Sequence, residues 1–300
     1  MPDFIEPALA TLRPKPPKGD NWVHEVKYDG YRFQAHIREG QVRFFTRRGY
    51  DWTARLAKLV PPAARLKAHA AILDGEAVVQ GENGHTDFNE LEREISRKGG
   101  SNKVIFYVFD LLYLDNLDLR PAPLLERKQV LAELLSTLEP GGPIVFSEHV
   151  EADGPELWQR ACALGLEGIV SKRKDARYQS GRIDTWTKSP CKRRETFVIL
   201  GWAEKGTRFD GFYLGEEHAG KLVYAGKIEG GWTEEQKADL LARVRPLRTR
   251  APPSALDVTK PKARWVEPRI LIDVEYRART AKSGLLRHPS YKGLRLDLME

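Results

Sequence analysis

Residues 24–33 read HEVKYDGYRF, and the rest of the chain is organised around this stretch. Its apolar and aromatic residues indicate a β-strand that ends in a tight turn at Asp29-Gly30. Because side chains alternate across a strand, we expect Glu25 and Lys27 on one face. A lysine that loses hydration among apolar residues is easier to deprotonate, and a neutral amine is a nucleophile. Taken alone, the stretch fits an exposed edge strand with an ordinary Glu–Lys pair better than a catalytic site.

The composition is that of a globular protein with room for two domains. The chain has 300 residues, of which 41% are hydrophobic and 30% are charged. No apolar run approaches membrane-spanning length, and residues 1–20 lack the apolar core of a signal peptide. Two cysteines, Cys162 and Cys191, are too few for a disulfide scaffold or a four-cysteine zinc site. We therefore expect a cytoplasmic protein.

Positive charge is concentrated in one part of the chain. The net charge is +7, which favours a polyanionic partner without proving one. Nine lysines and arginines lie between residues 172 and 194, interleaved with Tyr178 and Trp186. This cluster fits phosphate contacts and an ordinary solvated face equally well.

The sequence pattern changes near residue 193. Before it, we expect strands over 41–46 and 103–114, a helix over 124–138, and a helix over 53–69 with a break at Pro61-Pro62. Residues 1–20 predict an extended arm, and residues 70–80 a strand pair that turns at Asp74-Gly75.

After residue 193, short strands with glycine and aromatic punctuation surround one amphipathic helix, as in a small Greek-key barrel of OB type. We predict an α+β protein with two domains, residues 1–193 and 194–300.

Six motifs appear together in one order. After HEVKYDGYRF come TRRG (46–49), LDGE (73–76), YVFDLL (107–112), EGIVSK (167–172) and Trp186-Thr187-Lys188. In this order they resemble the ATP-dependent DNA ligases of the covalent nucleotidyltransferase superfamily. Residues 109–128 and 285–298 resemble the ligase module of bacterial non-homologous end-joining ligases. The resemblance covers residues 5–298 and implies a nucleotidyltransferase (adenylation) domain of antiparallel sheets with flanking helices, followed by an OB-fold domain.

The resemblance implies three phosphoryl-transfer steps. Lys27 attacks the α-phosphorus of ATP and becomes lysyl-AMP, AMP passes to a DNA 5′-phosphate, and the 3′-hydroxyl displaces AMP. Such chemistry needs positioning, charge neutralisation and a divalent cation held by oxygen ligands. The implied cofactors are ATP and Mg²⁺ or Mn²⁺, with Glu76 and Glu167 as metal ligands. The implied partners are duplex DNA with nicks or ends and a Ku-like end-binding protein, for a monomer acting at the bacterial nucleoid.

The resemblance also assigns binding roles to individual residues. Glu25 is expected to accept a hydrogen bond from the adenine amino group, and Phe109 to stack on adenine unless it is a core residue. The remaining assignments concern ribose, phosphates and pyrophosphate: Arg32, Arg47, Arg182 and Lys188 in the first domain, and Arg295 and Asp297 in the second. Closure of the two domains would need a mobile linker, for which we take the polar residues 192–195.

Two positions depart from the family pattern. Pro190 and Leu298 stand where the family usually carries lysines that serve the ATP phosphates. Losing a charge-assisted contact in a dry site weakens transition-state stabilisation, so the first step is expected to be less efficient unless Lys192, or Lys174 with Arg177, substitutes. The alternatives are an RNA ligase or GTP-using capping-type enzyme, and a non-catalytic module that grips DNA ends.

Overall fold

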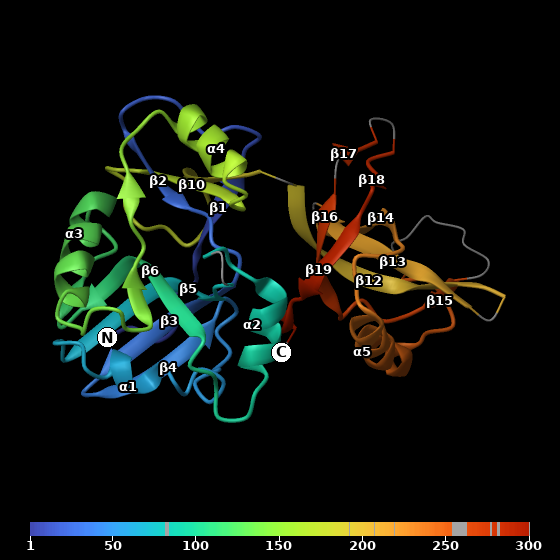
Figure 1. The fold of residues 1–300 in the computed structure, drawn as a ribbon, viewed down its shortest axis with the longest axis horizontal. Coiled ribbons are helices and arrows are strands. Elements are labelled where there is room, and N and C mark those ends of the chain that lie inside the picture. The colour runs from blue at the N-terminus through green and yellow to red at the C-terminus, as the bar shows by residue number, and fades with distance from the viewer. Residues whose placement is uncertain are drawn as a thin grey trace. The chain divides into compact units, whose positions relative to one another are not determined.

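The computed structural model describes residues 1–81, 84–191, 193–206, 208–218, 220–253, 263–276, 278–280 and 283–299. The chain divides into two compact units, Met1–Cys191 and Lys192–Glu300 (Figure 1). The boundary expected at residue 193 therefore lies two residues beyond the division that the structure gives. No helix within the described ranges is both long enough and apolar enough to cross a membrane.

Two mostly antiparallel sheets form the first unit. One has the strand order β1-β11-β10-β2-β9 and the other β4-β3-β5-β6-β7, with β8 pairing with β6. The strands of the first sheet are β1 (Ala8–Leu12), β2 (Trp22–Val26), β9 (His149–Val150), β10 (Gly168–Arg173) and β11 (Gly181–Pro190). Those of the second are β3 (Tyr31–Arg38), β4 (Gln41–Thr46), β5 (Ala70–Val79), β6 (Val104–Leu114), β7 (Leu117–Asp118) and β8 (Ile144–Phe146).

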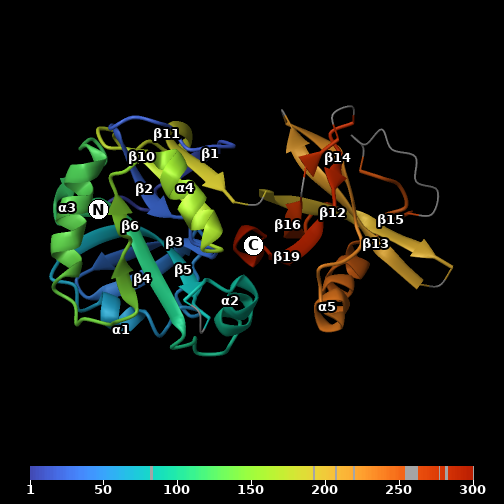
Figure 2. The same ribbon diagram turned by 45° about the horizontal axis from the view of Figure 1, so that its top comes forward.

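Helices flank these sheets, as Figures 1 and 2 show. They are α1 (Val60–Ala63), α2 (Phe88–Ile95), α3 (Leu124–Leu135) and α4 (Gly154–Ala163). Helix α3 packs on β6 and β8, whereas α4 packs on β10 and β2. Asp87 and Asp153 cap α2 and α4 by accepting hydrogen bonds from the first-turn backbone amides of Glu90 and Glu156.

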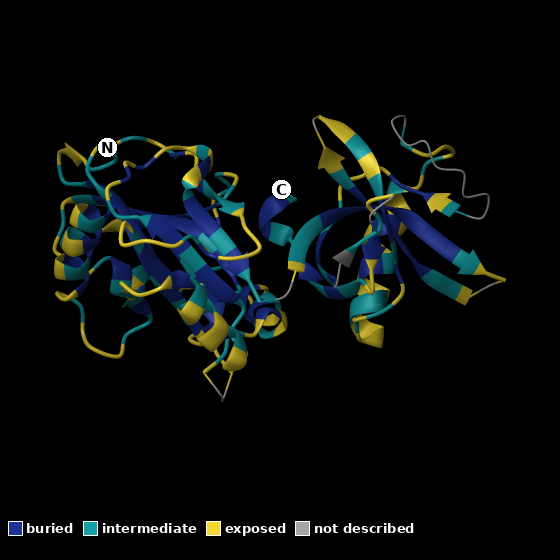
Figure 3. Ribbon diagram, turned by 90° about the horizontal axis from the view of Figure 1, so that it is seen from above, coloured by how far each residue is buried: buried dark blue, intermediate teal, exposed yellow. Residues whose placement is uncertain are grey.

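The apolar core of this unit includes a cluster that joins the two sheets. Val23, Ile183 and Trp186 of the first sheet lie in it with Ile72 and Phe109 of the second. The exposed residues lie mainly on loops and on outer helix faces (Figure 3). Because the two sheets share this core, a polar side chain that points from one sheet toward the other is buried.

Several predicted elements are confirmed. Strand β4 occupies the predicted residues 41–46, β6 lies within 103–114, and α3 lies within 124–138. The predicted helix over 53–69 is wrong, because most of that segment forms turns and only α1 is helical. Pro61 and Pro62 start α1 instead of breaking a longer helix. Proline is tolerated in the first turn, where its missing amide donor is not needed.

The predicted turn at Asp74-Gly75 is also wrong. Both residues lie inside the single strand β5, and the pairing register with β6 shifts at this point. A Cβ atom on Gly75 would lie 2.6 Å from the carbonyl oxygen of Tyr107, so glycine here permits close approach of two strands. The N-terminal arm likewise contains a strand, β1, which pairs in parallel with β11.

The second unit is built on one curved sheet with the strand order β14-β13-β12-β16-β19, and β15 pairs with β12. Its strands are β12 (Arg193–Lys205), β13 (Arg208–His218), β14 (Lys221–Ile228), β15 (Ala263–Trp265), β16 (Leu271–Tyr276), β17 (Ala278–Arg279), β18 (Leu286–Arg287) and β19 (Ser290–Leu294). The helical segments are α5 (Glu234–Val244), η1 (Arg245–Leu247) and η2 (Leu296–Leu298). Residues 193–195 of the expected linker are part of β12 and pair with β16, and residue 192 lies outside the described residues.

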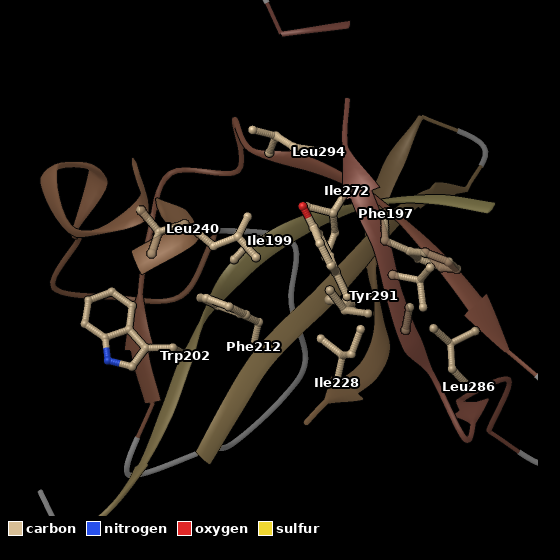
Figure 4. Close-up of a cluster of buried hydrophobic side chains, with 14 of the residues drawn as sticks. Phe197, Ile199, Trp202, Phe212, Ile228, Leu240, Ile272, Leu286, Tyr291 and Leu294 are labelled. Carbon is tan, nitrogen blue, oxygen red and sulfur yellow. The ribbon is translucent and has the colours of Figure 1, made fainter. Parts of the chain in front are cut away.

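The core of the second unit lies between the sheet and α5. Figure 4 shows Phe197 and Ile199 of β12, Phe212 of β13 and Leu240 of α5 in this cluster. Thr233 starts α5 with a reciprocal capping box to Gln236. Alternate β12 residues, Val198 and Leu200 among them, belong to a second apolar cluster on the other face of the strand.

The two cysteines form a disulfide. Cys162 near the end of α4 is bonded to Cys191 directly after β11, with their Cα atoms 5.3 Å apart. The sequence excluded a disulfide scaffold, and a single bond is all that two cysteines allow. The bond closes a loop of 29 residues that contains β10 and β11. It therefore ties the end of α4 to the end of β11, the strand that pairs with β10 beneath the helix.

We predict that this bond stabilises the first unit chiefly by restricting its unfolded chain. A loop of this length corresponds to about 3.5 kcal/mol of unfolding free energy. Reduction with a thiol should lower the melting temperature of that unit by roughly 10 °C in a calorimetric scan of the full chain. Cys162→Ser should melt at the lower temperature with or without reductant, and Cys162→Ser/Cys191→Ser should be no less stable. An equal effect of reductant on wild type and on the double variant would contradict this prediction.

Candidate active site

Lys27 lies where the chain crosses from one sheet to the other. Strand β2 ends at Val26 in the first sheet and β3 begins at Tyr31 in the second. The backbone amide of Lys27 donates to the carbonyl of Gly168 at 3.0 Å. A Cβ atom on Gly30 would lie 2.1 Å from the carbonyl oxygen of Ala77, so only glycine fits the crossing. The expected turn at Asp29-Gly30 is thus a connection between sheets.

One face of the first sheet carries a row of polar residues. Val170 of β10 lies opposite Glu25 of β2 and opposite Lys188 of β11. Residues directly opposite in an antiparallel pair point to the same side, so Glu25 and Lys188 share a face. Lys27 is two residues after Glu25 and continues that face. The register therefore brings together three of the predicted site residues.

The side chain of Lys27 contacts one carboxylate directly. Its Nζ atom forms an ion pair with Oε1 of Glu167, and about a fifth of the lysine side chain is exposed. The other oxygen of Glu167, Oε2, is buried and has no hydrogen-bond partner within the described residues. A buried carboxylate oxygen without a donor is costly unless a cation or a further donor reaches it. The amine attacks an electrophile only when its lone pair is free, so an ammonium proton has to leave Nζ before the attack.

Glu76 and Arg32 lie on the opposing sheet. They are directly opposite each other on β5 and β3, and Glu76 is half-buried. Arg32 donates to both oxygens of the buried Asp74, at 2.9 and 2.6 Å, and to the carbonyl of Ala8. Burial disfavours the charge of Arg32, but Asp74 outweighs it and raises the pKa of Arg32 above its ordinary value. Tyr178 completes this group with a hydrogen bond of 2.8 Å to Asp74.

The carboxylate of Glu25 is held by two lysines. Lys128 Nζ donates to Oε1 and Lys172 Nζ to Oε2, each at 2.8 Å, and all three side chains are buried. Burial raises the pKa of Glu25, but the two ammonium groups outweigh burial and hold it below the ordinary value. Burial lowers the pKa of Lys172 to about 8, with Lys128 acting in the same direction and Glu25 opposing it. Glu25 is therefore an ionised hydrogen-bond acceptor.

Phe109 belongs to the core cluster between the sheets, which was the alternative reading of this residue. The ammonium group of Lys172 lies 4.3 Å from the centre of its ring and 4.2 Å from the ring of Trp186. A cation between two aromatic faces is a favourable arrangement. Stacking of adenine on Phe109 stays a prediction.

The other predicted residues make contacts of their own. Arg47 follows β4 and is half-buried. Arg182 is exposed on β11 and donates to the carbonyl of Ala10 at 3.2 Å. In the second unit, Arg295 donates to both oxygens of Asp297, at 2.9 and 2.7 Å, and contacts Asp273 at 3.3 Å.

The two departures from the family pattern have different surroundings. Pro190 ends β11 opposite Gly168. Leu298 lies in η2 and is buried, so an apolar contact replaces a charged group there. Of the expected substitutes, Lys174 forms an ion pair with Glu151 and Lys192 lies outside the described residues.

Four residues of this region were given no role from sequence: Asp74, Lys128, Tyr178 and Trp186. Three of them lie inside motifs or phrases that were already identified, namely LDGE, the stretch 109–128, and Trp186-Thr187-Lys188. Motif membership was thus the available signal. The hydrogen bonds Arg32–Asp74, Lys128–Glu25 and Tyr178–Asp74, however, each join residues more than 40 positions apart in sequence, so no local pattern indicated these contacts. Within the described residues, no cluster of three or more histidine, cysteine or acidic side chains is arranged to hold a metal.

Two family models match the chain. The model described as ATP dependent DNA ligase domain matches residues 7–189, and the one described as ATP dependent DNA ligase C terminal region matches residues 205–298. The chain therefore belongs to the ATP-dependent DNA ligase family. This membership agrees with the sequence resemblance and does not favour the capping-type or non-catalytic alternatives.

Among curated proteins, the chain is similar to LigD, described as a multifunctional non-homologous end joining protein. It is 38% identical to the Pseudomonas aeruginosa protein over 99% of this chain and 36% of that protein. It is 32% identical to the Mycolicibacterium smegmatis protein over 99% of this chain and 39% of that protein. The chain thus spans less than two-fifths of the length of these relatives.

A solved structure agrees with the fold. A mycobacterial DNA ligase D complexed with ATP and MES is 30% identical, with a TM-score of 0.68 over 96% of this chain and 94% of that one. The predicted α+β fold, a nucleotidyltransferase domain followed by an OB-fold domain, is confirmed by this likeness and by the mixed sheets described above.

We predict that Gly30 is essential to the crossing that positions Lys27. Gly30→Ala introduces a methyl group against the Ala77 carbonyl and should lower the unfolding free energy by about 3 kcal/mol. Gly230→Ala is the matched control, because nothing lies within 4 Å of a Cβ atom there. Urea unfolding of both variants checks this expectation, and equal stabilities of the two would refute the close approach.

Proposed function

We propose that this chain is an ATP-dependent DNA ligase that seals breaks carrying a 5′-phosphate and a 3′-hydroxyl, and that it acts in double-strand break repair by non-homologous end joining. The observation that carries the proposal is the contact between Lys27 and Glu167 at the crossing of two sheets. Membership in the ligase family and the similarity to LigD support it. The substrate is duplex DNA with nicks or ends, a Ku-like protein is the proposed recruiting partner, and the chain acts as a monomer at the bacterial nucleoid.

In the first proposed step, the Lys27 lone pair attacks the α-phosphorus of ATP. A bond forms between Nζ and phosphorus, the bond from phosphorus to the pyrophosphate oxygen breaks with its electron pair going to pyrophosphate, and the proton from Nζ passes to solvent. Glu167 is the carboxylate in contact with this nitrogen and holds it at the end of β2. Lys188, on the same face, supplies a fixed positive charge for the developing charge at phosphorus. AMP then passes to the DNA 5′-phosphate, and the 3′-hydroxyl displaces it.

We propose Mg²⁺, or Mn²⁺, as the metal, with Glu167 and Glu76 as its protein ligands. Among the residues that the structure describes, none donates a hydrogen bond to the buried Oε2 of Glu167, which is a fitting environment for a cation ligand. Two carboxylates fit Mg²⁺, which commonly takes one or two from the protein and completes its shell with water and substrate phosphates. When bound, the metal neutralises phosphate charge.

The nucleotide contacts follow from the same faces. Glu25 is proposed to accept a hydrogen bond from the adenine amino group, and Phe109 to stack on the base. Arg32 and Arg47 are proposed to contact ribose or phosphates, and Arg182 the phosphates of ATP or DNA. Arg295 and Asp297 are proposed to orient the leaving pyrophosphate. To do so, Arg295 has to give up its hydrogen bonds to Asp297 and Asp273 for contacts with the pyrophosphate.

We predict that wild-type protein incubated with α-labelled ATP and Mg²⁺ becomes covalently labelled, and that Lys27→Ala does not. Removal of the nucleophile leaves no nitrogen for the phosphoamide bond. Lys103→Ala, which removes an exposed lysine of the same unit, should keep full labelling. Label on Lys27→Ala would exclude this residue as the nucleophile. If wild type takes no label but seals a pre-adenylated nick, Pro190 and Leu298 have removed the first step. If neither occurs, the chain is a binding module.

We also predict that Glu167→Gln lowers the labelling rate about 100-fold or more, because a charged ligand beside the reacting phosphorus is lost. Its half-saturating Mg²⁺ concentration should rise as well, which separates metal binding from loss of the Lys27 contact. Rates measured across a Mg²⁺ titration test this. An unchanged Mg²⁺ dependence would contradict the assignment of Glu167 as a ligand.

A further inference from the structure

Lys128 lies outside the six motifs, yet it touches one of their residues. It projects from α3 and its ammonium group donates to Glu25 Oε1 and to the carbonyl of Ser147, at 2.8 and 2.9 Å. It also lies 4.6 Å from the centre of the Phe146 ring. With only 1% of the residue exposed, Lys128 is held by a carboxylate, a carbonyl and an aromatic ring at once. It is therefore a fixed cation.

The second lysine fixes the other oxygen of the same carboxylate. Lys172 donates to Glu25 Oε2 and lies between the rings of Phe109 and Trp186. The two lysines come from different segments and clamp the carboxylate from both oxygens. Two positive charges around one carboxylate also strongly disfavour its protonation. The result is a carboxylate with one orientation and one charge state.

An ionised carboxylate only accepts hydrogen bonds, whereas a protonated one also donates. Each carboxylate oxygen has two lone-pair positions. Oε2 accepts from Lys172 and, at 3.5 Å, from the Ser147 hydroxyl, whereas Oε1 accepts from Lys128. The remaining position on Oε1 can accept from an exocyclic amino group such as the one at position 6 of adenine. A 6-oxo purine presents an acceptor at the same place and would oppose the carboxylate without a hydrogen bond.

We propose that Lys128 is a positioning residue for nucleotide selection: together with Lys172 it keeps Glu25 ionised and oriented, so that the site takes 6-aminopurine nucleotides and rejects 6-oxopurine nucleotides. This inference rests on the proposed function, in which Glu25 faces the base. Sites built to hydrogen-bond one polar group reject analogues lacking it strongly, because the buried partner is left unsatisfied.

The test compares ATP with inosine triphosphate, which carries a 6-oxo group and lacks the extra 2-amino group of GTP. Labelling rates give the ratio of second-order rate constants for the two nucleotides. Lys128→Met removes the cation while keeping an apolar stem, and should lower the ATP:ITP ratio at least ten-fold. Lys128→Gln keeps one neutral donor and should give a smaller drop. Lys103→Met is the matched control on an exposed lysine and should leave the ratio unchanged.

A double-variant cycle separates positioning from general damage. Glu25→Gln should itself reduce the ratio, because an amide both donates and accepts. Adding Lys128→Met to Glu25→Gln should then change the ratio no further. A folded Lys128→Met or Lys128→Gln protein in which both rates fall equally, with an unchanged ratio, would overturn the proposal. If Lys128→Met does not fold, Lys128→Gln and Glu25→Gln decide the question.

A binding measurement separates this inference from the proposed chemistry. In the Lys27→Ala background, affinities for ATP and ITP are measured by calorimetry, with and without Lys128→Gln. A preference for ATP over ITP that weakens in the Lys128 variant supports the inference. If wild type fails to take label while this preference is seen, only the proposed chemistry is contradicted. Equal affinities for ATP and ITP in the Lys27→Ala protein would overturn the inference and leave the chemistry standing.

Discussion

The first unit depends on charged side chains that are buried in its interior. Burying a charge is costly unless a partner and further hydrogen bonds compensate for the lost water. Here Glu25 is compensated by two lysines, Arg32 by Asp74, and the buried Arg127 by Asp110 at 2.8 Å. Removing one partner of such a pair typically costs about 3–5 kcal/mol, because the other is left buried and unpaired. Through Lys128 and Arg127, helix α3 is tied to β2 of the first sheet and to β6 of the second.

The same constraint places the candidate nucleophile. Lys27 directly follows strand β2. Glu25 of that strand is hydrogen-bonded to Lys128 of α3 and Lys172 of β10, and Gly30 lies where the chain passes to the second sheet. Lys27 is less buried than the pairs beside it and contacts a carboxylate whose other oxygen has no donor among the described residues. The fully buried ion pairs thus lie beside Lys27 and Glu167, which are partly exposed and can change their ionic contacts. That is a suitable arrangement for phosphoryl transfer, in which positioning and charge neutralisation dominate.

The C-terminal motif of the second unit places a buried apolar residue beside a charged group. Arg295 is held by Asp297 and Asp273, whereas Leu298 is a buried apolar residue. A leucine at this position contributes to the core, and a lysine there would have to leave it to reach a phosphate. The departure therefore exchanges a catalytic charge for burial. At Pro190 no such exchange is visible, since that residue ends a strand.

Local sequence determined the elements whose signals are local. The strand over 41–46, the apolar strand β6 and the helix α3 follow from alternation and periodicity. The motif order determined the family and the identity of Lys27 as the candidate nucleophile. The predictions at Pro61-Pro62 and Asp74-Gly75 were wrong. The effect of proline depends on its position in the helix, and Gly75 is required by the close approach of a neighbouring strand.

Only the tertiary structure decided what touches Glu25 and Arg32. Lys128 and Lys172 lie 103 and 147 residues from Glu25, and Asp74 lies 42 residues from Arg32. The Cys162–Cys191 bond and the crossing between sheets at Lys27 are of the same kind. Contacts between distant segments leave no periodicity in a single sequence, since they arise only when the sheets pack. The sequence by itself thus determined the family and indicated the candidate nucleophile, and packing decided the charged environment that surrounds it.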